Sequence, residues 1–210
     1  MNFLAHAFLA APDDSLVAGG ILGDWVKGPL DTHTLPPSFL RGVALHRAID
    51  AFADRNEAFQ RSRARFPPSR RRWSGILVDM YYDHLLAAHW PLWHPQTLEI
   101  FTQEAYRALA EHSSAFNDTK RYPEIQSVMA MMEKEDWFGH YATPDGLNAI
   151  LRRMGRRARQ PNPLAEGAQE LTGSPASFAA FYEDFAEFLP AARLFVADWL
   201  SQLPPIEASV

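Results

Sequence analysis

Two pairs of polar side chains stand out because of their spacing along the sequence. His46 and Asp50 are four residues apart, and Asp79 and Asp83 repeat that interval. Residues four apart on an α-helix project from the same face, about one turn from each other. Each pair could therefore offer its ligands to one metal ion. Mixed carboxylate and imidazole ligands suit manganese, iron, magnesium or zinc, and the number of carboxylates favours manganese or magnesium.

The sequence around Asp79 favours a metal over a solvated helix face. Asp79 lies in the segment 75–82, which has no polar face, and a buried carboxylate is costly unless a cation or strong donors satisfy it. A nearby arginine could supply that charge, so a purely structural ion pair is the alternative. A metal ion accounts for more residues, because His84 adjoins Asp83 and Asp24 follows the glycine-rich segment 19–23.

The motifs of several other catalytic classes are absent. The chain has no cysteine, no H-E-x-x-H, no E-x-x-H pair of di-iron bundles, no G-x-S-x-G elbow, no Walker loop and no G-x-G-x-x-G. Nucleotide-driven and serine- or cysteine-nucleophile chemistries are therefore disfavoured. Metal-assisted hydrolysis remains, in which the ion lowers the pKa of bound water and neutralises charge on a phosphoryl group.

The elements that must position these residues are helices. Apolar residues recur at intervals of three and four, and no useful period-2 alternation occurs. We expect helices over about 38–59, with Ser38 as its cap, and over 69–90, 97–112, 123–134 and 144–159. A further helix should begin at Ser174, with Pro190 starting or kinking another. The helices over 38–59 and 69–90 should pack antiparallel and bring both ligand pairs together.

Length and composition indicate one helical domain over residues 1–210, in an acidic chain of formal net charge −5. The lack of cysteine suits a reducing cytoplasm. The apolar N-terminus has no basic region and contains His6, which argues against a signal peptide. No apolar run approaches the roughly 18 residues of a membrane span. We therefore expect a cytoplasmic protein with neither membrane nor nucleic acid as a partner.

The basic residues are concentrated in two runs that contain no acid. Eleven of the twenty lysines and arginines lie in these runs: Arg61, Arg63, Arg65, Arg70, Arg71 and Arg72 in the first, and Arg152, Arg153, Arg156, Arg157 and Arg159 in the second. Either run could be an ordinary solvated surface, or it could steer an anionic partner towards the protein.

Four segments together resemble the acyl carrier protein phosphodiesterases, divergent relatives of the HD-domain phosphohydrolases. They are Met1-Asn2-Phe3-Leu4-Ala5-His6, Gly23-Asp24-Trp25-Val26-Lys27-Gly28, His46-Arg47-Ala48-Ile49-Asp50 with Asp54, and Asp79-Met80-Tyr81-Tyr82-Asp83-His84-Leu85-Leu86 with His89-Trp90. Their combination and order are specific, whereas each alone is a weak signal. The match covers about the first ninety residues. No adjacent His-Asp dipeptide occurs, so the ligand assignments of ordinary HD enzymes do not transfer directly.

The resemblance implies a compact, HD-domain-like helical bundle that hydrolyses the phosphodiester between 4′-phosphopantetheine and a serine of acyl carrier protein. The implied cofactor is a divalent metal, typically Mn²⁺, with Mg²⁺ or Fe²⁺ as alternatives. We expect metal ligands at Asp24, His46, Asp50 and Asp79, with Asp83 a further ligand or the base, and His84 or His6 as the acid. The acidic carrier would dock on Arg70, Arg71 and Arg72 or on Arg152, Arg153, Arg156 and Arg157.

Two other functions are compatible with the same residues. An HD-like phosphohydrolase acting on a small nucleotide or phosphomonoester would use the same metal chemistry without a protein-docking surface. A non-enzymatic helical binding module would leave the Asp and His pairs solvated or ion-paired and would bind no metal.

Overall fold

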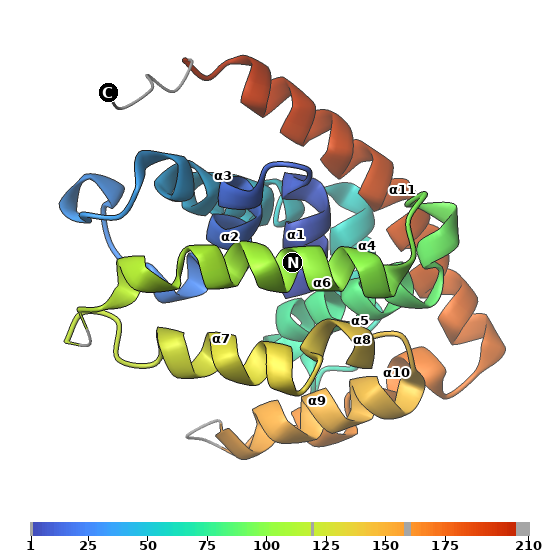
Figure 1. Ribbon diagram of the computed structural model, residues 1–210. Coiled ribbons are helices and arrows are strands. Elements are labelled where there is room, and N and C mark those ends of the chain that lie inside the picture. Colours follow the sequence, from blue (N-terminus) through green and yellow to red (C-terminus); the bar gives the residue numbers. More distant parts are fainter. Residues whose placement is uncertain (1, 119, 158–160, 205–210) are drawn as a thin grey trace.

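The computed structural model describes residues 2–118, 120–157 and 161–204, and within these ranges the regular structure is entirely helical (Figure 1). This confirms the predicted all-α fold. The α-helices are α1 (Phe3–Ala10), α2 (Asp14–Leu22), α3 (Pro37–Ala53), α4 (Glu57–Ala64), α5 (Ser74–Ala88), α6 (Leu98–Glu111), α7 (Ile125–Lys134), α8 (Trp137–His140), α9 (Pro144–Arg157), α10 (Gln169–Thr172) and α11 (Pro175–Ser201).

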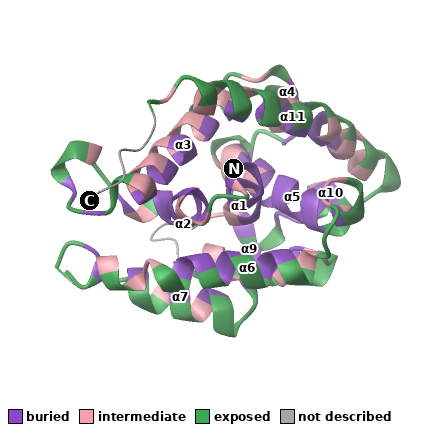
Figure 2. Ribbon diagram, turned by 45° about the horizontal axis from the view of Figure 1, so that its top comes forward, coloured by how far each residue is buried: buried purple, intermediate pink, exposed green. Residues whose placement is uncertain are grey.

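Helix α1 is the central element of the N-terminal half. All of its residues from Leu4 to Ala10 are buried, which explains why this segment is apolar. It packs against α2, α3 and α5, and it lies between α3 and α5 (Figure 2). The two helices that carry the ligand pairs therefore meet mainly through α1. The expected direct antiparallel packing of those two helices was wrong.

The predicted helix over 38–59 is in fact two helices. Helix α3 ends at Ala53, and the side chain of Asn56 accepts a hydrogen bond from the backbone N–H of Phe59 at 3.2 Å, which caps α4. At the other end, α3 begins at Pro37, the first helical position that proline favours, so Ser38 is not its cap.

Helix α11 runs without a break through Pro190, so the prediction of a second helix starting there was wrong. Pro190 is exposed at the surface. On the inner side, Phe181 and Phe185 contact the rings of Tyr81 and Tyr82, with centroids 5.0 and 5.4 Å apart. These phenylalanines of α11 are therefore part of the core. None of the described helices, including the long α11, has both the length and the apolar character needed to cross a membrane.

Candidate metal centre

His6, His46 and Asp50 form a compact group of three metal-ligating side chains. His6 comes from α1, and His46 and Asp50 come from one face of α3. The Nε2 atoms of His6 and His46 lie 3.2 Å from Oδ1 and Oδ2 of Asp50, respectively. One ligand atom from each residue lies within 4.8 Å of the others. The four-residue spacing thus predicted the proximity of His46 and Asp50, whereas His6 joins them through the packing of α1.

The orientation of His46 is set by its other ring nitrogen. Nδ1 lies 2.8 Å from the carbonyl oxygen of Gly20, and a carbonyl can only accept, so Nδ1 carries the donated hydrogen. When the ring is neutral, Nε2 therefore carries no hydrogen, and its lone pair faces the carboxylate of Asp50. Two acceptors at this distance repel each other unless a cation lies between them. The geometry therefore calls for a proton or a metal ion at Nε2.

The ionisation of the group suits metal binding. Burial by itself raises the pKa of Asp50, but hydrogen bonds with His46 and His6 outweigh it and hold that pKa well below its usual range. Burial and the neighbouring His46 lower the pKa of His6 to about 3. Metal ligation requires an ionised carboxylate and neutral imidazoles, so Asp50 and His6 are held in the ligating forms. Two imidazoles and a carboxylate are a donor set that divalent transition metals accept.

Asp24 lies at the open edge of this group. Its Oδ1 is 3.9 Å from Nε2 of His46 and 3.5 Å from Nζ of Lys27, and its side chain is 61% exposed. Arg47 holds the surrounding loop on α3 by donating to the carbonyl oxygens of Val26 and Gly28, at 2.7 and 2.8 Å. Asp24 is therefore placed where a ligand or substrate would approach from solvent.

Asp79 lies on the α5 side of the group and is only partly exposed. Burial raises the pKa of Asp79, the N-terminal amino group opposes that rise, and the charge of Asp50 makes a smaller contribution that adds to it. A cation nearby would lower the cost of keeping both ionised. Asp79 is not part of the compact three-residue group.

Asp83 and His84 make contacts that serve the packing of α5. The carboxylate of Asp83 is fully buried and accepts hydrogen bonds from the backbone N–H groups of Leu4 and Ala5, at 2.9 and 3.0 Å. These are first-turn donors of α1 that have no partner within the helix. The buried ring of His84 hydrogen-bonds through Nδ1 to the carbonyl oxygen of Tyr141 at 2.7 Å. Asp83 therefore positions the helix that carries His6.

The first arginine run is largely neutralised by acids from distant parts of the chain. Arg61 and Arg65 both pair with the buried Asp184 of α11, at 2.9 and 2.8 Å. Arg70 is buried and pairs with Glu170. Arg70, Arg71 and Arg72 were expected to dock a partner, but only Arg71 and Arg72 are exposed.

The second run differs because its charge remains at the surface. Arg152 and Arg156 are exposed on α9 and form no ion pair with any residue that the structure describes. Arg153 is partly buried, pairs with Glu135 at 2.5 Å, and lies 4.2 Å above the ring of Trp137. The side chain of Arg157 lies outside the described residues. Helix α9 therefore offers free positive charge, whereas the first run mostly does not.

Three residues that support the centre were not predicted. Gly20 supplies the carbonyl for His46, Gly23 lets that ring approach the backbone, and Arg47 fastens the loop of Asp24. A methyl group on Gly23 would lie 2.4 Å from Cγ of His46. The recurrence of glycine through residues 19–23, just before Asp24, was the signal that a side chain approaches this backbone closely.

Comparisons with known proteins agree with the resemblance found in the motifs. The family model described as acyl carrier protein phosphodiesterase matches residues 1–192. The proteins named acyl carrier protein phosphodiesterase from Salmonella dublin and Salmonella agona are each 30% identical over 190 residues, which cover 90% of this chain and 94% of the relative. No solved structure matches the chain.

Proposed function

The chain belongs to the acyl carrier protein phosphodiesterase family, and from this premise we propose that it hydrolyses the phosphodiester joining 4′-phosphopantetheine to a serine of holo-acyl carrier protein. The products are the apo-carrier and free 4′-phosphopantetheine. The observation that carries this proposal is the convergence of Nε2 of His46 and Nε2 of His6 on the carboxylate of Asp50, each at 3.2 Å. This arrangement supports a cation at the position where a phosphodiesterase needs one.

We propose that His6, His46 and Asp50 hold the cation, with Asp24 joining from the exposed edge and Asp79 from the α5 side. A divalent ion there, Mn²⁺ in preference to Mg²⁺ or Fe²⁺, would stabilise negative charge on the phosphoryl oxygens and activate water. The hydrogen bond from His46 to Gly20 supports this role, since a fixed Nδ1–H directs the Nε2 lone pair to the ion. Asp83 and His84 are assigned positioning roles rather than proton transfer.

The test is to incubate the purified protein with holo-carrier and Mn²⁺ and to follow the carrier by mass spectrometry. We expect loss of the phosphopantetheine mass, and loss of both turnover and bound metal in His46→Ala and Asp50→Ala with helical circular dichroism retained. If the protein hydrolyses nucleotides or phosphomonoesters but leaves holo-carrier uncleaved, the small-substrate alternative is favoured. A protein without bound metal or turnover would favour the non-enzymatic binding module.

We further propose that the acidic carrier docks on α9, through Arg152 and Arg156. Both side chains are exposed, as are Arg71 and Arg72 of the first run, but in that run Arg61, Arg65 and Arg70 are committed to Asp184 and Glu170. The proposed compartment is the cytoplasm, which suits a chain without cysteine.

The docking surface is tested by charge reversal of matched pairs. Arg152→Glu with Arg156→Glu should raise the KM for holo-carrier about tenfold at low salt and flatten its salt dependence. The control is Arg71→Glu with Arg72→Glu, which makes the same change of charge at exposed positions of the first run. Equal effects of the two double variants would mean that general electrostatic attraction, rather than docking on α9, accounts for the salt dependence.

A further inference from the structure

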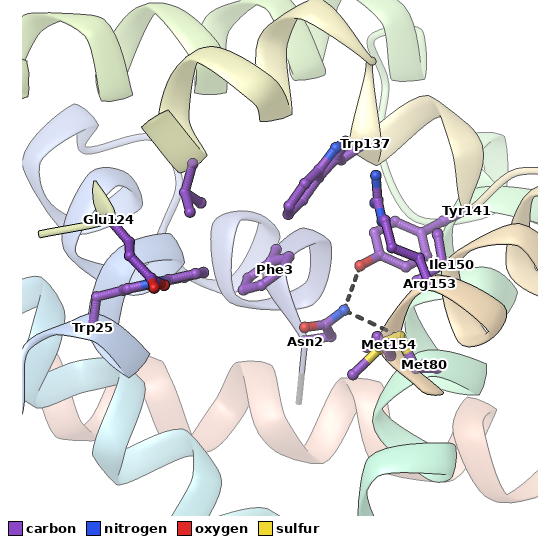
Figure 3. A pocket seen from close by; sticks show the side chains of 11 residues that line it. Asn2, Phe3, Trp25, Met80, Glu124, Trp137, Tyr141, Ile150, Arg153 and Met154 are labelled. Atoms are coloured by element: carbon purple, nitrogen blue, oxygen red, sulfur yellow. Dashed lines mark hydrogen bonds between the residues drawn. The ribbon is translucent and has the colours of Figure 1, made fainter. Parts of the chain in front are cut away.

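A cavity of about 210 Å³ lies at the beginning of α1 (Figure 3). Its walls are mainly aromatic and apolar, with Phe3, Trp25, Trp137, Met80 and Met154 among the lining residues. The Phe3 ring stacks on Trp25, with centroids 5.6 Å apart, and tilts against Trp137 at 6.1 Å. A concave apolar site with few polar groups is the usual form of a small-molecule pocket.

The cavity and the candidate metal centre draw residues from the same three segments of the chain. Phe3 is one turn before His6 on α1, Trp25 directly follows Asp24, and Met80 directly follows Asp79 on α5. One helical turn corresponds to about 5.4 Å along the axis. A substrate with its phosphate at the metal centre could therefore extend one of its two ester groups into this cavity.

On the basis of the proposed function, we propose that the cavity binds the pantetheine arm of the substrate, beginning with the pantoyl group next to the phosphate. Of the two groups esterified to the phosphate, the serine belongs to a folded protein and must stay at the surface. The arm is the slender, uncharged group that can enter. A cavity of about 210 Å³ has room for a group of several heavy atoms, such as the pantoyl unit with its dimethyl, hydroxyl and carbonyl groups.

Among the polar residues that line the cavity, which include Glu124, Asn2 suits an arm that contains amides and a hydroxyl. Asn2 donates through Nδ2 to the hydroxyl of Tyr141 and to the sulfur of Met80, the latter at 3.4 Å. Its Oδ1 stands on the opposite side of the amide group, available to an N–H or O–H of the arm (Figure 3). Arg153 also lines the cavity, on the same helix as the proposed docking residues. Carrier and arm would thus be recognised side by side.

The test uses pantetheine, which lacks the phosphate and therefore probes the cavity separately from the metal centre. Val128 lines the cavity from α7, and Val128→Phe would partly fill it. Ala130→Phe adds a ring at an exposed position of the same helix outside the cavity and is the matched control. Pantetheine binding is measured by quenching of tryptophan fluorescence, since Trp25 and Trp137 are in the wall. Turnover is measured with holo-carrier and with bis(4-nitrophenyl) phosphate.

We expect pantetheine to quench the fluorescence of the wild-type protein and to raise the KM for holo-carrier. Val128→Phe should weaken pantetheine binding about tenfold and lower the ratio of carrier to small-diester kcat/KM to a similar extent, while Ala130→Phe does neither. A wild-type protein that processes holo-carrier but shows no competition by pantetheine, with the ratio unchanged in Val128→Phe, would overturn the proposal and leave the proposed function standing. A wild-type protein that binds pantetheine but does not process holo-carrier would refute the proposed function, while the binding itself supports the cavity.

Discussion

The replacement Gly23→Ala disturbs the candidate metal centre without removing any ligand. The new methyl carbon would lie 2.4 Å from Cγ, 2.7 Å from Cδ2 and 2.8 Å from Cβ of His46, whereas ordinary contacts begin at 3.4 Å. Gly23 itself has φ −53°, so alanine is not strained there. The ring of His46 must therefore move by about 1 Å, the difference between 3.4 and 2.4 Å.

A displacement of this size is large compared with the tolerance of a metal site. Distances from a metal to its ligands are held within about 0.2 Å, and a shift of 1 Å at an active site can cost about 100-fold in rate. The shift also lengthens the bond from Nδ1 to Gly20, and loss of such an orienting bond weakens metal binding about 10- to 100-fold. Crowding should lower the free energy of unfolding by about 1–3 kcal/mol.

We therefore expect Gly23→Ala to raise the dissociation constant for Mn²⁺ about 10- to 100-fold, measured by calorimetry, and to lower kcat/KM for holo-carrier about 100-fold. Two controls add the same methyl group elsewhere. Gly75→Ala meets no atom within 4 Å, and Gly20→Ala meets its nearest atom at 3.4 Å while keeping the carbonyl that His46 needs. A folded Gly23→Ala protein with wild-type Mn²⁺ affinity would refute the assignment of His46 as a ligand.

Three other changes test the surroundings of the centre. Burial raises the pKa of Asp83 to about 7, so the folded protein keeps a proton that the unfolded chain has released. As pH rises from about 4 to 7, this group should lower the free energy of unfolding by up to about 4 kcal/mol. Urea unfolding of Asp83→Asn should lack this dependence on pH, and an equal dependence in the two proteins would contradict the prediction. Asp184→Asn should lower the free energy of unfolding by about 2–4 kcal/mol, measured by thermal unfolding, because Arg61 and Arg65 lose their buried partner. The affinity for Mn²⁺ should not change, and a variant as stable as the wild type would contradict the prediction. Arg47→Met should lower kcat/KM about tenfold by freeing the loop of Asp24, and unchanged kinetics would show that this anchor is dispensable.

Patterns within short segments of the sequence predicted helices and the contacts within one helix. The four-residue interval on one helix placed His46 beside Asp50, and apolar spacing predicted most of the helices. What depends on packing between distant segments was missed. His6 is forty residues from His46, and its place in the group follows from the burial of α1 between α3 and α5. Asp83 has the same spacing from Asp79 as Asp50 from His46, yet it satisfies the first turn of α1.

The arginine runs show why charge in a sequence is a weak guide to charge on a surface. The first run has no acid within it, yet Asp184 and Glu170 reach it from segments about a hundred residues later and neutralise several of its members. The second run keeps exposed charge because α9 presents Arg152 and Arg156 away from its partners. Arg153, on the same helix, lies in the wall of the cavity. An acidic carrier attracted to α9 would already have its arm beside the cavity, so charge would speed association while the cavity selects the arm.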